Sequence, residues 1–234
     1  MQKSMIKLLS FADIISITNA VFGALAILVL FTKLDFKIHL SLSLILLGLL
    51  ADGLDGIIAR KFKKSKIGDY LESMADMTSM VVAPSVFIFY IYSDVLLGEF
   101  LRQIFLFIAI VLFFSFGVLR LASFSVMKEK KIFIGLPASA SAIILLILAY
   151  FRVELIYILF STIIIGALMA SDIVFPKPGK IINGAALILI ILTIIFQKGF
   201  FAFAPILLLF AIFVYIIGGA FFIKFYPKKQ QKGL

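Results

Sequence analysis

The sequence predicts an all-α fold, a polytopic transmembrane helix bundle of about eight spans with an N-terminal interfacial helix. The chain is 64% hydrophobic and 15% charged, with a mean hydropathy of +1.23, whereas soluble domains are about half apolar and a quarter charged. Uncharged runs such as 14–31 and 181–196 reach or approach the roughly 18–20 residues that cross the hydrocarbon as a helix. The short alternating segments of a membrane β-barrel are absent. The sequence therefore indicates an integral membrane protein.

The helical segments follow from the hydropathy pattern. Residues 1–12 would form the interfacial helix, because their apolar side chains share one side and their lysines lie on another. The spans are expected at 13–31, 39–59, 69–93, 101–124, 134–150, 155–170, 181–196 and 201–222. We interpret 1–234 as a single membrane domain, in which 13–170 form a six-span catalytic core and 171–234 add two spans and a basic tail.

The distribution of lysine and arginine orients these spans. With an even number of spans and a cytoplasmic N-terminus, 17 of the 22 basic residues fall on the cytoplasmic side. The residues left on the opposite side are Lys33, Lys37, Arg102, Arg152 and Lys198. Cytoplasmic segments of membrane proteins are enriched in basic residues. We therefore expect a multi-pass protein of the cell membrane whose N-terminus is cytoplasmic.

Charge and cysteine content exclude several classes of function. The net charge of +10 is explained by the basic cytoplasmic segments and by attraction to anionic lipid, so we expect the lipid bilayer as a partner and no nucleic acid. The chain has no cysteine, which excludes disulfides, thiolate nucleophiles and cysteine-based metal sites.

Five of the twelve acidic residues gather in the segment from Asp52 to Asp76. Asp52 and Asp55 lie three residues apart, and Glu72 and Asp76 lie four apart, so each pair shares one face of a helix. Two antiparallel helices joined near 61–67 would bring the four carboxylates together on the cytoplasmic side. Left unpaired at membrane depth, four such groups would cost about 10–14 kcal/mol. This segment is therefore the predicted active site.

Two divalent cations are the simplest means of neutralising four carboxylates. Hard oxygen ligands without nearby His or Cys suit Mg²⁺ or Mn²⁺ rather than zinc, and a two-metal clamp matches displacement at phosphorus. Gly53, Gly56 and Ala59 leave room for a ligand beside the helix, and Arg60 offers a fork for phosphate. Two other interpretations stay open: internal ion pairs with the neighbouring lysines, and a cation transporter with a carboxylate-lined permeation site.

The acidic segment resembles the signature of the CDP-alcohol phosphotransferase family, D-x-x-D-G-x-x-A-R followed after seven or eight residues by G-x-x-x-D-x-x-x-D. The matching positions are Asp52, Asp55, Gly56, Ala59, Arg60, Gly68 and Asp76. The third acid differs, because Glu72 stands where the family has Asp. The longer side chain moves the carboxylate outward by one methylene, which would alter metal geometry, affinity or activity.

The resemblance implies a reaction in which an alcohol attacks the β-phosphorus of a CDP-linked lipid and CMP leaves. The acids that would hold two metal ions are Asp52, Asp55, Glu72 and Asp76. The positions that would border the substrate are Gly56, Ala59, Arg60 and Gly68. The last acid, Asp76, would also be the general base for the alcohol.

Further segments are similar to the phosphatidylserine synthases of that family. They are Leu71–Pro84, Leu119–Phe124 and Phe133–Pro137, with Asn19 and Gly23 in the first span. This similarity covers residues 13–145 and implies L-serine as the acceptor, with glycerol phosphate or an inositol phosphate as alternatives. The family resemblance also implies a homodimer. The sequence does not distinguish acyl from isoprenoid-ether chains on the donor lipid, because lipid tails contact generic apolar surface.

Two polar residues within spans are further substrate-binding candidates. Asn19 needs a partner in the low-dielectric interior, either a substrate or a neighbouring helix. Arg120 would meet the carboxylate of the acceptor or a lipid phosphate, or it would anchor the cytoplasmic end of the fourth span.

Overall fold

The structure, a computed structural model, describes residues 9–58, 65–93, 98–124 and 132–225. Within these residues a helix lies at each of the eight predicted spans. Seven are single helices: α1 (Phe11–Leu30), α2 (Lys37–Ile58), α5 (Phe100–Phe124), α6 (Ala138–Tyr150), α7 (Leu155–Met169), α8 (Lys180–Phe196) and α9 (Phe203–Phe225). The third span is composite: α3 (Gly68–Asp76), a π-helical segment (Met77–Val82) and α4 (Ala83–Ser93) follow one another without a break.

The fold class is confirmed as a helical bundle of membrane-protein character. In the described residues four helical units are long and apolar enough to cross a membrane, namely Phe11–Leu30, Lys37–Leu54, Gly68–Ser93 and Phe100–Ser123. The described parts of α6 to α9 are shorter apolar helices. The structure thus supports eight apolar helices, of which four have spanning length.

A two-stranded sheet was not predicted. β1 (Ile132–Ile134) pairs antiparallel with β2 (Val174–Pro176), which joins the connection after α5 to the connection before α8. The fifth helix therefore begins at Ala138, later than expected. Gly135 makes the turn between β1 and that helix at φ +75°, where a Cβ would collide with the carbonyl of Met169. Glycine alone adopts this backbone conformation without strain.

The predicted interfacial helix at 1–12 lies mostly outside the described residues. Leu9 and Ser10 are described and are not helical. The Ser10 side chain accepts a hydrogen bond from the backbone N–H of Asp13, while the Asp13 carboxylate accepts from the Ser10 N–H at 2.6 Å. This capping box satisfies donors at the start of α1. The expected helix is therefore wrong at its C-terminal end, and its last residues belong to α1.

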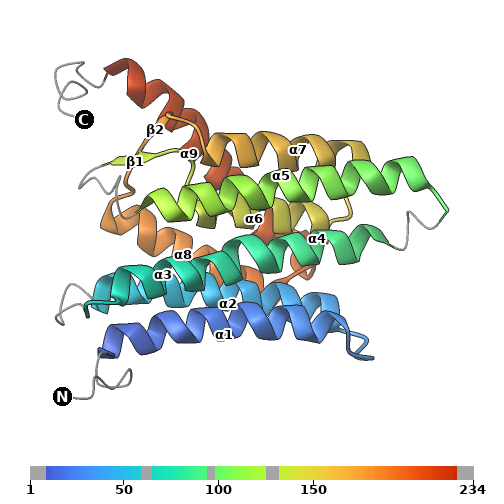
Figure 1. The fold of residues 1–234 in the computed structure, drawn as a ribbon, viewed down its shortest axis with the longest axis horizontal. Coiled ribbons are helices and arrows are strands. Elements are labelled where there is room, and N and C mark those ends of the chain that lie inside the picture. Colours follow the sequence, from blue (N-terminus) through green and yellow to red (C-terminus); the bar gives the residue numbers. More distant parts are fainter. Residues whose placement is uncertain (1–8, 59–64, 94–97, 125–131, 226–234) are drawn as a thin grey trace.

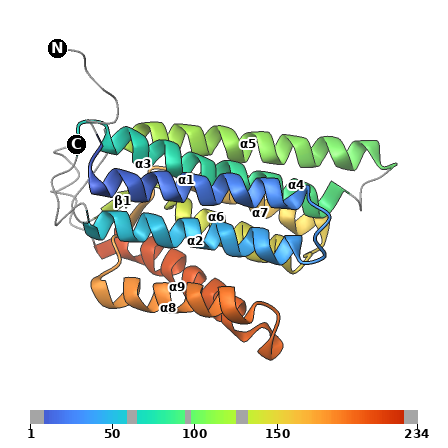
Figure 2. The ribbon, with the colours of Figure 1, turned by 90° about the horizontal axis from the view of Figure 1, so that it is seen from below.

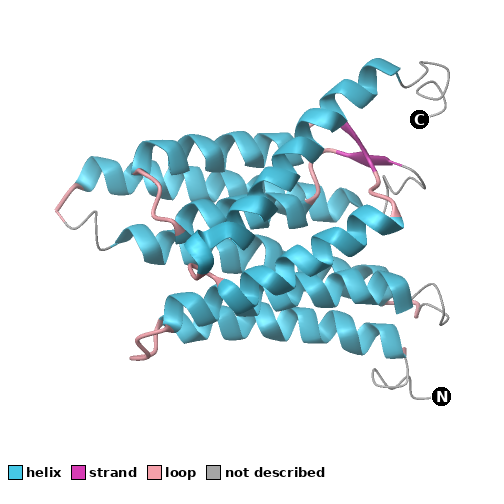
Figure 3. Ribbon diagram, turned by 180° about the vertical axis from the view of Figure 1, so that it is seen from behind, coloured by secondary structure: helices cyan, strands magenta, loops and turns pink. Residues whose placement is uncertain are grey.

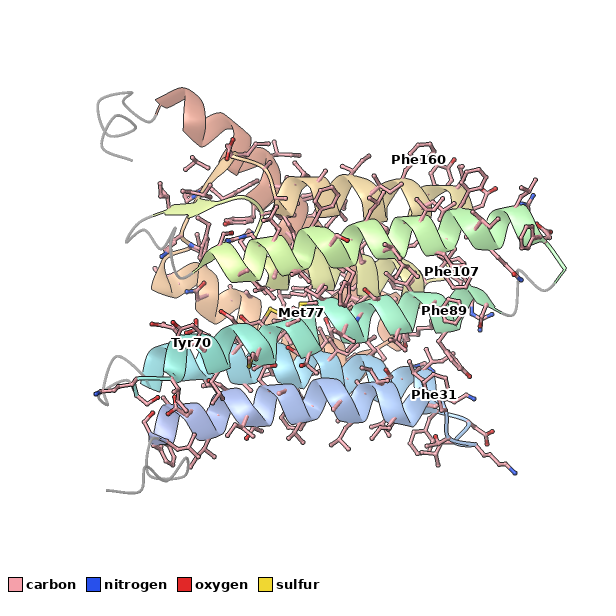
Figure 4. All side chains as sticks on the ribbon, viewed as in Figure 1. Phe31, Tyr70, Met77, Phe89, Phe107 and Phe160 are labelled. Atoms are coloured by element: carbon pink, nitrogen blue, oxygen red, sulfur yellow. The ribbon has the colours of Figure 1, made fainter. Side chains whose placement is uncertain are left out.

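Helix α6 occupies the centre of the bundle. Nearly all of its side chains are buried, because it packs against α4, α7 and α9. Around it α1 pairs with α2 and α5 pairs with α7 (Figure 1). The last two helices flank the bundle, with α8 against α2 and α9 against α6 and β2 (Figure 2). Phe89 of α4 stacks on Phe107 of α5 at a centroid distance of 5.5 Å (Figure 4).

The two ends of the bundle differ in what they carry. At one end lie the start of α1, the end of α2, the start of α3, the end of α5 and both strands (Figures 1 and 3). We call this the basic end, because the predicted cytoplasmic segments meet there. The residues predicted on the other side lie at the opposite end: Lys33, Lys37, Arg102, Arg152 and Lys198. The predicted grouping of the connections is therefore what the fold produces.

This grouping predicts a labelling pattern in a chain that has no native cysteine. Lys66→Cys and Asp172→Cys are exposed positions at the basic end, and Lys33→Cys and Lys198→Cys are exposed positions at the opposite end. In sealed vesicles of one orientation, a membrane-impermeant maleimide should label one pair directly and the other pair only after detergent is added. A split within either pair would contradict the arrangement of the ends.

Candidate active site

The first half of the acidic segment lies in the last turns of α2, at the basic end. Asp52 is half-buried there, and a Cβ added at the neighbouring Gly53 would meet open space. Asp55 and Gly56 belong to α2, but their side chains lie outside the described part. Ala59 and Arg60 lie outside the described residues altogether. The prediction that these positions face a ligand therefore stays a prediction.

The second half forms α3, which returns from the basic end beside α1. Gly68 is the buried first residue of this helix, and Glu72 and Asp76 are both half-buried. Tyr70 and Met74 are instead 71% and 72% exposed, so they lie on the outer side of the helix (Figure 4). The shared face predicted for Glu72 and Asp76 is therefore the face turned toward the bundle.

Asn19 of α1 contacts the last acid of the signature directly. Its side-chain N–H donates to Asp76 Oδ1 at 3.0 Å, across 57 positions of sequence. Asn19 is 1% exposed, and its Oδ1 has no hydrogen-bond partner in the described part of the chain. The bond joins α1 to α3, so the interpretation of Asn19 as a hydrogen-bond donor to a neighbouring helix is confirmed, although the sequence did not indicate that Asp76 is the partner.

Asp13 is a buried acid that the sequence analysis did not consider for the site. Only 2% of it is exposed, and it lies on the same buried face of α1 as Ser16 and Asn19. The signal was present in the sequence, because polar residues at three-residue intervals on an otherwise apolar helix form one stripe. This stripe faces the helix pair that carries the signature acids.

Two glycines allow α1 and α2 to approach the chain segment that follows Asp76 closely. A Cβ at Gly23 of α1 would lie 2.8 Å from the Cα of Ser79, and a Cβ at Gly48 of α2 would lie 3.3 Å from the Cβ of Ser79. Ser79 belongs to the π-helical segment, which begins at Met77 immediately after Asp76. π-helical turns inside α-helices are frequent at functional sites. The close contact fixes the position of Asp76 along the axes of α1 and α2.

Arg120 is placed near the end of α5, as predicted, but it is only 7% exposed. Its Nε donates to the carbonyl of Leu136 at 3.5 Å. An anchor at the membrane surface keeps its charged group in water. The burial of Arg120 therefore favours a role inside the bundle over the anchor interpretation.

Helix packing brings Arg120 to a similar depth along the bundle as Asp76. A Cβ at Gly117 would lie 2.7 Å from the side chain of Val81, so α5 and the π-helical segment touch there. The two run in opposite directions, and Arg120 lies about 4.5 Å beyond this contact toward the basic end. Asp76 lies beyond the same contact in the same direction. A charged donor and a carboxylate thus approach the same region from two helices.

The structure does not by itself assemble a complete metal centre. Among the described side chains, no three acidic or histidine groups lie close enough together to hold a metal ion. The side chain of Asp55, one of the four predicted ligands, is outside that set. The four-carboxylate metal site therefore stays a prediction.

A sequence profile named CDP-alcohol phosphatidyltransferase matches residues 9–174. The chain belongs to the CDP-alcohol phosphatidyltransferase family. It is therefore an enzyme, and the predicted signature is that of its own family. The match runs from the start of α1 to the start of β2, so α8 and α9 lie beyond the shared core.

Relatives within this family have consistent names. A protein of Methanocaldococcus jannaschii named CDP-diacylglycerol–serine O-phosphatidyltransferase is 36% identical over 75% of this chain and 78% of its own length. An archaetidylserine synthase of Methanothermobacter thermautotrophicus is 33% identical over 75% of this chain and 73% of its own length. A CDP-diacylglycerol–serine O-phosphatidyltransferase of Bacillus subtilis is 34% identical over 69% of this chain and 87% of its own length.

The glycine contact behind the signature acids of this phosphatidyltransferase can be tested by substitution. Gly23→Ala should reduce stability by about 1–3 kcal/mol, because the new methyl group overlaps the backbone of Ser79 and one helix must move. Gly218→Ala is the matched control, since nothing lies within 4 Å of that position in α9. Thermal unfolding in detergent measures both. Equal melting temperatures for the two variants would contradict the close packing.

Proposed function

We propose that the protein transfers a phosphatidyl-type group from a CDP-linked lipid to the hydroxyl of L-serine and releases CMP. The observation that carries this proposal is the similarity, at 28–36% identity, to relatives whose names specify transfer to serine or an archaetidylserine product. Family membership also removes the support for a cation transporter. Glycerol phosphate and an inositol phosphate are the alternative acceptors.

The reaction needs one proton acceptor and a precisely held phosphorus. The serine hydroxyl oxygen forms a bond to the β-phosphorus, the bond from that phosphorus to the oxygen shared with the α-phosphate breaks, and CMP leaves with that oxygen. Asp76 would take the hydroxyl proton, because its half-buried carboxylate faces the interior of the bundle, where a bound acceptor would lie. Arg60 and the small residues Gly56, Ala59 and Gly68 would border the CDP moiety.

The donor chemistry of the acids fits a hard divalent cation. Asp52, Asp55, Glu72 and Asp76 would hold Mg²⁺ or Mn²⁺, as two ions, through carboxylate oxygens. The Oδ1 of buried Asn19, which has no partner among the described residues, is a further hard oxygen beside Asp76. When bound, the ions supply neutralisation of the diphosphate charge. The residues of the chain orient the reactants and accept the proton.

Arg120 is the proposed contact for the carboxylate of the acceptor. A guanidinium pairs with a carboxylate through two parallel hydrogen bonds, and burial strengthens such a pair. Arg120 approaches the level of Asp76 from α5, on the far side of the π-helical segment from α1 and α2. A bound serine between Arg120 and Asp76 would then have its hydroxyl near the base.

We further propose that the basic end is cytoplasmic and that the enzyme is a homodimer. The bias of 17 to 5 basic residues supports the orientation. It would place the active site where a water-soluble acceptor meets a membrane-held donor. The dimer rests on the family resemblance.

A CMP-release assay tests the reaction and its acceptor. Purified protein with CDP-diacylglycerol, L-serine and Mg²⁺ or Mn²⁺ should release CMP in a serine-dependent manner, and EDTA should abolish the release. Glu72→Asp serves as a parallel sample, because it restores the carboxylate spacing of the family signature. CMP release that requires glycerol phosphate or an inositol phosphate would overturn the choice of acceptor. No release with any of these alcohols, in either protein, would overturn the proposed reaction.

The role of Asp76 as base predicts a separation of turnover from binding. Asp76→Asn should lower kcat by about 10²–10⁴-fold, since the amide accepts no proton, while the affinity for the CDP-lipid changes little. Asp172→Asn, an exposed acid at the same end of the bundle, is the control. Steady-state kinetics and binding of the CDP-lipid measure the two effects. Parallel loss of turnover and binding would argue against the base.

A further inference from the structure

Asn19 is a buried amide with only one of its two polar atoms paired in the described residues. Its Nδ2 donates to Asp76 Oδ1 at 3.0 Å, and its Oδ1 has no partner among the described groups. An orphaned buried acceptor reduces stability, whereas an apolar side chain of similar shape would not. The bundle therefore holds an asparagine where a leucine would pack at least as well. Stability alone does not account for this residue.

The packing around Asn19 leaves its amide little freedom. A Cβ at Gly48 would lie 2.9 Å from Asn19 Oδ1, so the absence of a side chain at Gly48 creates the space that the amide occupies. One turn further along α1, Gly23 is pressed against Ser79 of the π-helical segment. Three helices thus fix the distance between Asn19 and the end of α3.

The bond from Asn19 restrains the orientation of the Asp76 carboxylate. An amide N–H can only donate, and a carboxylate oxygen can only accept while it is ionised. The bond therefore restrains the rotation of the carboxylate about its Cβ–Cγ axis. Outer partners of this kind orient metal-binding carboxylates, and their loss typically lowers metal affinity or activity by about 10–100-fold.

We propose that Asn19 is a positioning residue for Asp76: the α1 amide, confined by Gly48, holds the carboxylate in the orientation required for cation binding and proton transfer. The inference rests on the proposed function, in which Asp76 is a metal ligand and the general base. It adds α1 to the active site, although α1 carries none of the four signature acids.

The decisive variant is Asn19→Leu, which keeps the size and branching of the side chain and removes the donor. Its Mn²⁺ affinity, measured by equilibrium dialysis without substrate, should fall about 10–100-fold. Its kcat should stay reduced at saturating Mn²⁺, because the base is no longer oriented. Its melting temperature without metal should change little, because removal of the orphaned oxygen offsets loss of the hydrogen bond to Asp76.

Ser41→Ala is the matched control for a purely structural bond. The Ser41 hydroxyl donates to the carbonyl of Ala26 at 2.8 Å, so it is also a buried bond involving α1, but it lies near the start of α2, away from the acids. This variant should lower the melting temperature and leave Mn²⁺ affinity and kcat within threefold of the unmodified protein.

A second variant tests the same amide through a substitution in α2. Gly48→Ala places a methyl group against Asn19 Oδ1 and should displace the amide, so Mn²⁺ affinity should fall in the same direction as in Asn19→Leu. Gly184→Ala in α8, where nothing lies within 4 Å, controls for the added methyl group.

The outcomes separate this proposal from the proposed function. Unmodified protein that binds no Mn²⁺ and releases no CMP would overturn both. Normal Mn²⁺ binding and turnover in the unmodified protein, with an Mn²⁺ affinity of Asn19→Leu within threefold of it, would overturn only the role of Asn19. A fall in melting temperature for Asn19→Leu like that of Ser41→Ala, with metal affinity unchanged, would identify a structural bond instead.

Discussion

The close contact of α1, α2 and the π-helical segment is the constraint on which the candidate active site depends. In lipid, helices gain nothing from excluding water from one another, so they associate through close packing of small residues and through interhelical hydrogen bonds. Gly23 and Gly48 supply the close packing, and Asn19 supplies the hydrogen bond. A larger residue at either glycine would separate the helices that hold Asp76 in place.

The π-helical segment lets one stretch of chain satisfy two neighbours at once. The backbone N–H of Ala83 donates to the carbonyl of Thr78, five residues earlier, so this turn is wider than an α-helical turn. Ser79 meets α1 and α2, while Val81, two residues later, meets Gly117 of α5. The segment thus connects the helices on the acid side of the bundle to the helix that carries Arg120.

The small sheet has a similar connecting role on the other side. β1 and β2 tie the connection after α5 to the connection before α8, and Leu136, just after β1, accepts the bond from Arg120. Phe175 of β2 stacks on Tyr215 of α9 at 5.9 Å. Helix α9, which lies beyond the core shared with the family, therefore contacts the sheet whose strand β1 precedes the Leu136 carbonyl that binds Arg120.

Local patterns in the sequence determined the helices, their order, the grouping of their connections and the family. The length of an apolar run and the position of charged residues are properties of single segments, so they can be recognised without knowledge of the tertiary structure. The spacing of Glu72 and Asp76 predicted that both share one face of a helix for the same reason. The two strands were not predicted, because a strand of three residues is too short to give a periodic hydrophobic pattern.

Only the tertiary structure decided which polar groups meet. Asn19 and Asp76 are 57 positions apart, and their bond depends on how closely the helices approach one another, which Gly23 of α1 and Gly48 of α2 control together. The burial of Arg120 likewise depends on a sheet formed by two distant connections. Such contacts follow from the shape of the assembled bundle, because no single segment carries enough information to specify its neighbours.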